Sequence, residues 1–214
     1  MRIIGVDLAG PCNSRDTAMV WLRERGNTLW LEGSKASCDD SGLFAVAQEL
    51  AARDEVSVGL DAPLSYNPGG GDRPSDASLR ESIVRAGLAP GSVMAPTLTR
   101  MAYLALRGVV VARGLERVAS SRIKVVEVHP HAAMVLRGAP AALVRGLKRS
   151  RDPRHKLTVW LHDQGLRGLE VFRNPSVHTL DAAAAALAAW CWSRGHPVWI
   201  WHAQPPHHPY DFAC

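Results

Sequence analysis

Four acidic residues stand where separate apolar segments of the chain end or begin. Asp7 follows the run RIIGV and Asp61 follows VSVGL, whereas Glu127 lies inside IKVVEVH and Asp181 opens an alanine-rich stretch. Hard divalent ions such as Mg²⁺ and Mn²⁺ take oxygen ligands, so their sites need several carboxylates that converge on one point. We therefore predict a metal site made of Asp7, Asp61, Glu127 and Asp181.

The chemistry expected of these acids is metal-dependent hydrolysis. Two divalent ions about 4 Å apart can activate a water and stabilise the leaving oxygen of a phosphodiester. We expect two Mg²⁺ or Mn²⁺ ions, bridged by Asp7 and Asp61 and completed by Glu127 and Asp181, and we expect all four acids to be catalytic. Structural interpretations stay open, because Asp7 could be a turn acid and Asp181 a first-turn helix cap. Glu127 is harder to explain in this way, since an acid among valines is costly unless it has a partner.

Histidines and a basic run accompany the acids. His129 and His131 come just after Glu127, and His178 lies three residues before Asp181, on the same face of a helix. Each histidine could bind metal, move protons or be structural. The basic run could bind nucleic-acid phosphates or form a solvated face. It comprises Arg145, Lys148, Arg149, Arg151, Arg154 and Lys156.

Apolar segments bounded by turn residues predict the strands that must carry these acids. Residues 2–8 are typical of a buried strand ended by a turn, and residues 17–22 and 28–32 flank a charged loop, as in a hairpin. Residues 56–63 and 123–129 give two further strands, each closed by a proline. These segments predict a mixed five-stranded sheet with an antiparallel meander beside its first strand.

Helix caps indicate where two of the covering helices begin. Ser41 can cap an amphipathic helix that continues to about Ala52. Ser176 or Thr179 can cap the alanine-rich helix, which would place Asp181 in its first turn.

Two more segments, 77–88 and 97–118, have helical periodicity. We expect them to form a helical insertion over the edge of the sheet at about residues 66–120. The chain should then fold as a single α/β domain over residues 1–214, with helices on both faces of the sheet and residues 198–201 as an additional edge strand.

The composition describes a foldable, basic chain. Its 214 residues are 47% hydrophobic and 21% charged, whereas disordered chains are more polar and more highly charged. This composition therefore excludes a disordered chain. The formal charge of +5 favours an anionic partner such as DNA or RNA. The cysteines lack the spacing of a zinc site or a disulfide framework. The longest apolar stretch is about half of the roughly 20 residues that a membrane-spanning helix needs. We expect a cytoplasmic protein without membrane contact.

The segments IGVDLAG, VGLDAPLS, VVEVHPHAA and HTLDAAAAALAA together resemble the domain of unknown function 429 family, and the resemblance spans nearly the whole chain. This is a family of predicted nucleases with a ribonuclease H-like fold, related to the Holliday-junction resolvase group. The resemblance therefore implies that fold, nuclease activity on DNA or RNA and, as in junction-cleaving enzymes, a homodimer. It also implies that Arg73, Asp76 and Arg80 lie near the site.

Other functional classes stay open. The same fold could serve a non-catalytic protein that binds nucleic acid or nucleotide phosphates, or a phosphohydrolase that acts on small phosphate compounds. A phosphotransferase related to sugar kinases is less favoured, because it needs a second similar lobe, for which 214 residues leave no room. The glycine run 69–71 also lacks the Lys-Ser/Thr ending of a phosphate-binding P-loop.

Overall fold

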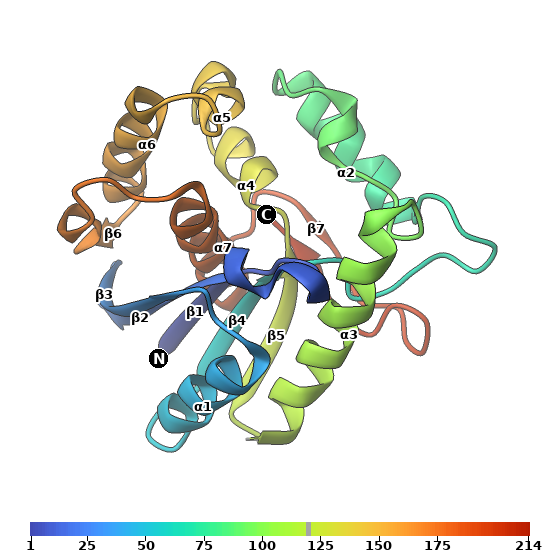
Figure 1. Cartoon of the computed structure of the whole chain (residues 1–214), viewed down its shortest axis with the longest axis horizontal. Helices are drawn as coiled ribbons and strands as arrows, with labels where there is room; N and C mark the ends of the chain where they lie inside the picture. Colours follow the sequence, from blue (N-terminus) through green and yellow to red (C-terminus); the bar gives the residue numbers. More distant parts are fainter. Residues whose placement is uncertain (119–120) are drawn as a thin grey trace.

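A computed structural model describes residues 1–118 and 121–214 of the chain. Strands and helices alternate along the sequence (Figure 1). The strands are β1 (Arg2–Asp7), β2 (Ala18–Arg25), β3 (Thr28–Ala36), β4 (Val56–Asp61), β5 (Ile123–Val128), β6 (Leu166–Arg167), β7 (Ile200–Trp201) and β8 (Phe212–Ala213). The α-helices are α1 (Asp40–Ala51), α2 (Pro74–Arg85), α3 (Arg100–Val118), α4 (Pro130–Leu136), α5 (Ala141–Gly146), α6 (Arg151–Asp163) and α7 (Val177–Ser193). Short 3₁₀ helices are η1 (Pro11–Asp16), η2 (Pro90–Ser92) and η3 (Leu169–Val171).

The strands of the described residues form one mixed sheet in the order β6-β3-β2-β1-β4-β5-β8-β7. β1, β2 and β3 form the predicted antiparallel meander, and β4 and β5 continue the sheet parallel to β1. The α/β class is confirmed, but the prediction of five strands is wrong, because the sheet has 8. β7 lies within residues 198–201, where an additional edge strand was predicted, and it ends the sheet. β6 and β8 were not predicted, because their 2 residues each are too few to show an alternation of apolar and polar side chains.

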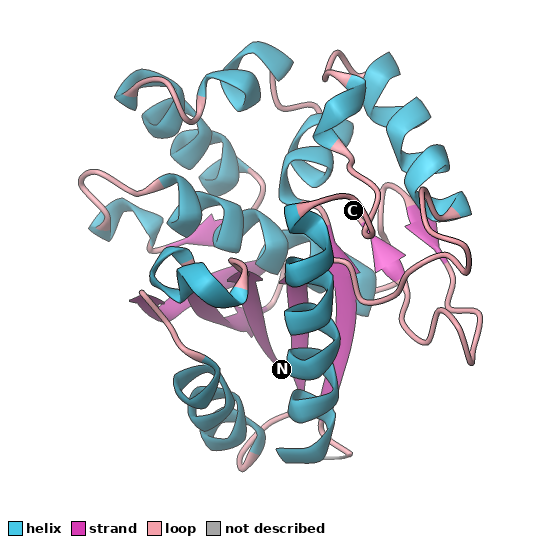
Figure 2. Cartoon of the chain, turned by 45° about the vertical axis from the view of Figure 1, so that its right-hand side comes forward, coloured by secondary structure: helices cyan, strands magenta, loops and turns pink. Residues whose placement is uncertain are grey.

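Helices cover both faces of the sheet, as predicted (Figure 2). Each face has its own hydrophobic core. On one face α1 and α3 pack against residues such as Ile4, Val58 and Val125. On the other face α7 lies against the strands, and α2, α4, α5 and α6 add a further layer around it. Because side chains of a strand alternate between faces, the two cores also report which way each strand residue points.

Two strand glycines bring α7 close to the centre of the sheet. A Cβ atom at Gly5 would overlap the carbonyl oxygen of Ala182, and one at Gly59 would overlap that of Ala185. The side chains of α7 that face the sheet are small, because residues 182–186, 188 and 189 are all alanine, and each of them is 0% exposed. This close approach holds the beginning of α7 near the carboxyl ends of β1 and β4.

The predicted helical insertion at 66–120 contains α2, η2 and α3. Its role differs from the prediction, because α3 packs on the face of the sheet and connects the parallel strands β4 and β5. α2 packs against α4. Residues 119–120 of the predicted insertion lie outside the described residues.

Helix caps account for small shifts from the predicted boundaries. The N-cap of α1 is Asp39, whose Oδ1 accepts a hydrogen bond of 2.8 Å from the backbone N–H of Gly42, and not Ser41. α2 begins at Pro74, which is favoured at the first helical position. Within 1–118 and 121–214, no helix is both long and apolar enough to cross a membrane.

Candidate active site

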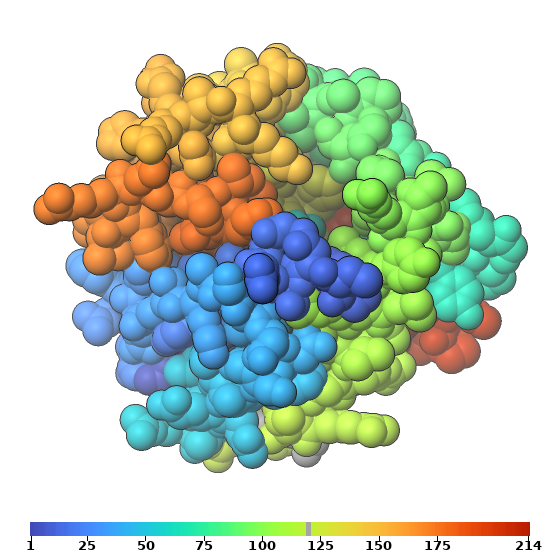
Figure 3. All heavy atoms as spheres, viewed as in Figure 1, coloured from blue at the N-terminus to red at the C-terminus, as the bar shows by residue number. Residues whose placement is uncertain are grey.

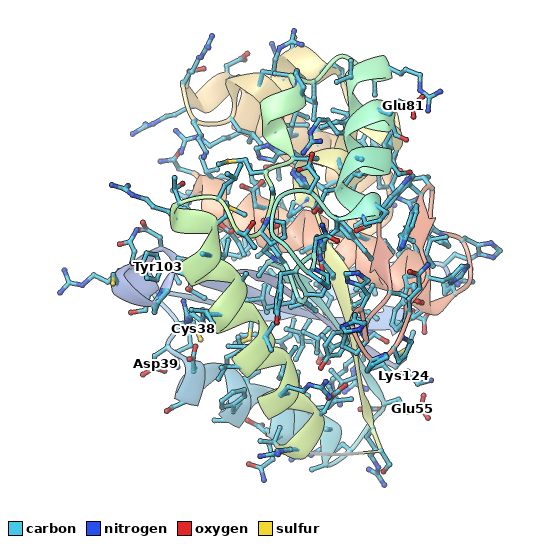
Figure 4. All side chains as sticks on the ribbon, turned by 90° about the vertical axis from the view of Figure 1, so that its right-hand side faces the viewer. Cys38, Asp39, Glu55, Glu81, Tyr103 and Lys124 are labelled. Carbon is cyan, nitrogen blue, oxygen red and sulfur yellow. The ribbon has the colours of Figure 1, made fainter. Side chains whose placement is uncertain are left out.

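A cavity of about 670 Å³ gathers most of the predicted site residues at the carboxyl ends of β1, β4 and β5. Figure 3 shows the recess between α3, in green, and the gold and orange segment that contains α5 and α7. Glu55 and Lys124, at the starts of β4 and β5, lie far from α2 in Figure 4, at the other end of these strands. The cavity is lined by all four predicted acids, Asp7, Asp61, Glu127 and Asp181.

Asp7 and Asp61 lie side by side because β1 and β4 pair in parallel with these residues in register. Neighbouring strands are about 4.8 Å apart. Gly5 and Gly59 face α7, so Asp7 and Asp61, two residues further along, point to the same face. Burial, opposed in part by the hydrogen bond from His178, raises the pKa of Asp7. Burial and then the charges of Asp7 and Asp181 raise the pKa of Asp61 well above its usual range. The two carboxylates therefore repel each other in a poorly solvated place.

Asp181 approaches this pair from α7. Ser176 caps the helix by accepting a hydrogen bond of 3.0 Å from the Thr179 backbone N–H, so Asp181 lies in the second turn and not, as predicted, in the first. The residue is only 7% exposed. Its Oδ1 lies 3.2 Å from Nε2 of His131 without hydrogen-bond geometry, and neither atom has a hydrogen-bond partner among the described residues. These two buried polar atoms thus face each other inside the cavity without a hydrogen bond.

His178 contacts Asp7 directly. Its Nδ1 lies 2.7 Å from Oδ2 of Asp7, and the imidazole is 43% exposed. An ionised carboxylate can only accept, so Nδ1 carries the proton, and Nε2 has no hydrogen-bond partner among the described residues. The hydrogen bond to Asp7 raises the pKa of His178. The predicted proximity of His178 and Asp181 also holds, since both line the cavity.

Glu127 differs from the other three acids. Its register partner is Leu60, which points into the core beneath α1 and α3, so Glu127 lies on the opposite face of the sheet from Asp61. Both carboxylate oxygens accept hydrogen bonds from Arg73, at 2.5 and 2.8 Å, and Oε2 also accepts from the backbone N–H of Leu64 at 2.8 Å. Protein donors therefore already surround the carboxylate that we predicted to complete a metal site.

Arg73 and Asp76 do lie at the site, as the resemblance implied, but they bind each other and Glu127. Asp76 accepts hydrogen bonds from the backbone and side chain of Arg73 at 2.7 to 3.0 Å. Burial alone would lower the pKa of Arg73, but the adjacent carboxylates raise it, so the guanidinium stays charged. Ser65, which no sequence pattern indicated, also contacts Arg73 at 3.0 Å. These residues form a buried support beneath the cavity.

Arg80 lies outside the cavity lining. Its guanidinium pairs with Asp72 at 2.6 and 2.7 Å and donates to the Val93 carbonyl at 3.0 Å. Arg80 therefore holds the connection between α2 and α3 in place. Val93 of this connection lines the cavity, whereas Arg80 itself does not.

The two neighbouring histidines have different roles. His129 caps α4, because its Nδ1 accepts from the Ala132 N–H at 3.3 Å while Nε2 donates to the Ser92 carbonyl at 2.7 Å. Burial lowers the pKa of His129, so it is a neutral structural residue. His131 points into the cavity, and although burial opposes it, Asp181 raises the pKa of His131. The sequence indicated the pair but could not choose between its members without knowing that α4 begins at Pro130.

The structure divides the predicted basic run. Arg145, Lys148 and Arg149 line the cavity, whereas Arg151, Arg154 and Lys156 do not. Arg145 donates to the Gly87 carbonyl beyond α2. Outside the cavity, Lys156 pairs with Asp152 at 2.8 Å, as side chains one helical turn apart do. Only the first half of the run can reach a molecule in the cavity.

These residues fit a hard cation, although no three His, Cys, Asp or Glu side chains of the described residues stand ready in ligand geometry. Asp7 and Asp61 repel each other, and a divalent ion between carboxylates removes such repulsion. The buried Oδ1 of Asp181, without a hydrogen-bond partner among the residues described, supplies a further oxygen. Asp7, Asp61 and Asp181 are therefore the residues that would hold an ion.

Comparison with known proteins places the chain in a family. No curated protein and no solved structure matches it. A family model described as "Protein of unknown function (DUF429)" matches residues 5–205. Because this match covers most of the chain, the protein belongs to the DUF429 family.

Proposed function

We propose that this protein is a metal-dependent nuclease that hydrolyses phosphodiester bonds in nucleic acid. The observation that carries the proposal is the meeting of Asp7, Asp61 and Asp181 from β1, β4 and α7 in one cavity, with a buried carboxylate oxygen of Asp181 lacking a hydrogen-bond partner among the described residues. The fold we propose is ribonuclease H-like, which is supported by the antiparallel meander β1-β2-β3 followed by the parallel strands β4 and β5.

The three aspartates would hold Mg²⁺ or Mn²⁺, with two ions as our expectation. A bound divalent ion supplies a water of lowered pKa and stabilises the charge that develops on the phosphate. Asp7 is held in place by His178, whose free Nε2 is left to donate or accept a proton at the cavity mouth. Lys148 and Arg149, which line the same cavity, can bind phosphate oxygens. Glu127 acts indirectly, by anchoring Arg73 and the segment that begins at Leu64.

The alternative with the most support is hydrolysis of a small phosphate compound. A cavity of about 670 Å³ lies within the range of small-molecule sites, roughly 300 to 1,000 Å³. A non-catalytic binding protein would use the same residues, but it would not need a metal for turnover.

The decisive experiment is cleavage of labelled single-stranded, duplex, hybrid and four-way-junction substrates with Mn²⁺, together with a small phosphodiester. We expect cutting by the wild-type protein that is lost with a chelator and reduced at least 100-fold in Asp61→Asn, since removal of a metal ligand removes most of the catalysis.

Glu81→Gln is a matched control. Glu81 is an exposed acid on the outer side of α2 (Figure 4), 3.6 Å from Arg85 and outside the cavity lining. The Glu81→Gln variant should cut the substrates as fast as the wild-type protein does. Cleavage retained by Asp61→Asn would overturn the proposal, and cleavage of only the small phosphodiester would favour the alternative.

A further inference from the structure

The walls of the cavity differ in chemical character. Lys148 and Arg149, in the turn that follows α5, form one wall. Met94 and Met101, from the connection to α3 and its first turn, together with Leu104 form the other. Figures 1 and 3 show these segments on the two sides of the recess. The acids lie between them.

Lys148 and Arg149 are free to bind an anion. Both side chains are exposed, and neither takes part in an ion pair or a side-chain hydrogen bond within the described residues. Lys148 lines the same cavity as Asp61 and His131. A phosphate held by Lys148 would therefore lie next to the aspartates.

Met94 and Met101 offer a surface that suits a planar ring. Thioethers are polarizable and make favourable contacts with aromatic rings. Met94 is 44% exposed, and the adjacent Val93 is 5% exposed, so one side chain projects into the cavity while its neighbour anchors the segment. The wall has few polar groups that could select one base from another, and the ring would be held mainly by packing.

The size of the cavity limits what can enter. A volume of about 670 Å³ accommodates a ligand of drug-like size. A base that packs against Met94 and Met101 inside the cavity cannot at the same time be stacked in a duplex, so the nucleotide that enters must be unstacked.

We propose that the cavity binds a single unstacked nucleoside phosphate unit, with its phosphate on Lys148 and Arg149 and its base against Met94 and Met101. The unit is either a free nucleotide or part of a single strand. This inference rests on the proposed function for its metal and deepens it by naming the substrate class.

Binding of ligands that contain no phosphodiester bond tests the inference without reference to nuclease activity. Calorimetry on the full chain with Mn²⁺ compares adenosine 5′-monophosphate, adenosine and inorganic phosphate. Lys148→Ala should weaken the binding of the monophosphate and of inorganic phosphate about tenfold, because one charge-assisted contact is lost, and should leave the binding of adenosine unchanged. Met94→Ala should weaken the binding of the monophosphate and of adenosine about threefold and leave the binding of inorganic phosphate unchanged.

Matched controls lie outside the cavity. Lys156→Ala removes a lysine that pairs with Asp152 on α6, and Val110→Ala removes an apolar side chain that is 62% exposed on α3. Neither should change binding of any of these ligands. Equal effects of both cavity variants on all three ligands would overturn the division into two walls.

Competition separates the two sources of the ligand and tests the exclusion of duplex. A single-stranded trinucleotide that displaces the monophosphate supports binding of a strand, whereas tighter binding of the free monophosphate supports a nucleotide site. A blunt duplex that competes as well as the single strand would overturn the inference. If the binding pattern is found and no nucleic acid is cut, the nuclease proposal is wrong and the inference stands. If nucleic acid is cut and Lys148→Ala binds and cuts normally, the inference is wrong and the nuclease stands.

Discussion

A carboxylate can serve a cation only if protein donors have not already satisfied it, and the acids of this cavity differ in that respect. Glu127 accepts three hydrogen bonds from Arg73 and Leu64. Asp181 has a buried oxygen that accepts none from the described residues. Glu127 therefore contributes to the stability of the fold. Burial of the Asp181 oxygen without a hydrogen bond instead lowers the stability of the free protein, and a bound cation would offset that loss.

This contrast predicts different effects of neutral substitutions on stability. Glu127→Gln leaves the Arg73 charge buried with too few partners, which should cost about 3 kcal/mol or more. Asp181→Asn removes a carboxylate whose buried Oδ1 faces only His131, at 3.2 Å, without a hydrogen bond, so it should change the free energy of unfolding by less than about 1 kcal/mol. Urea unfolding with a chelator present measures both. A loss of stability in Asp181→Asn as large as that in Glu127→Gln would make Asp181 a structural residue.

The cysteines allow a second test at this scale. Burial raises the pKa of Cys214 to about 12, and it also raises the pKa of Cys38 and Cys191. Cys12 is exposed. Alkylation requires the thiolate, which forms only as the pH approaches the pKa. At pH 8, iodoacetamide should label Cys12 first and Cys214 only after denaturation, as read by peptide mass spectrometry. Labelling of Cys214 as fast as Cys12 would mean that the end of the chain after β8 is not docked.

At the scale of elements, the site depends on how closely α7 approaches the sheet. Asp181 belongs to the helix, whereas Asp7 and Asp61 belong to strands, so their meeting depends on Gly5 and Gly59. A spacer of one methyl group between helix and strand would move the third carboxylate away from the other two.

Gly5→Ala should therefore reduce stability and activity together. The added methyl would overlap backbone atoms of α7, which cannot move as a flexible side chain can, and overpacking of this kind costs about 3 kcal/mol. Gly10→Ala is the control, because a Cβ there meets nothing within 4 Å. The thermal midpoint and the rate of Mn²⁺-dependent cleavage are measured for both variants, and both quantities should fall in Gly5→Ala only. A fully stable but inactive Gly5→Ala would show that the helix shifts without unfolding.

At the scale of the whole molecule, the sequence was informative wherever local pattern determines structure. The meander, the parallel strands carrying Asp7 and Asp61 and the alanine-rich helix follow from periodicity and turn residues. The pairing of Glu127 with Arg73 did not follow, because it depends on the register of β5 against β4, which no local pattern determines. The choice of His131 over His129 likewise depends on where α4 begins, and the missed strands β6 and β8, with 2 residues each, are too short to have a pattern.

The arrangement of positive charge predicts how binding of a single strand depends on salt. The slope of log K against log[salt] for single strands is about −0.7 for each phosphate neutralised. Only Arg145, Lys148 and Arg149 of the basic run line the cavity, so we expect a slope of about −2 where engagement of the whole run would give about −4. Fluorescence anisotropy of a labelled oligonucleotide in a KCl series at fixed Mn²⁺ measures it. The double variant Lys148→Ala, Arg149→Ala should make the slope shallower by about 1.4, and the triple variant Arg151→Ala, Arg154→Ala, Lys156→Ala should leave it unchanged. A reduction by the triple variant would mean that the nucleic acid lies across the outer surface of α6 and that the cavity receives only its end.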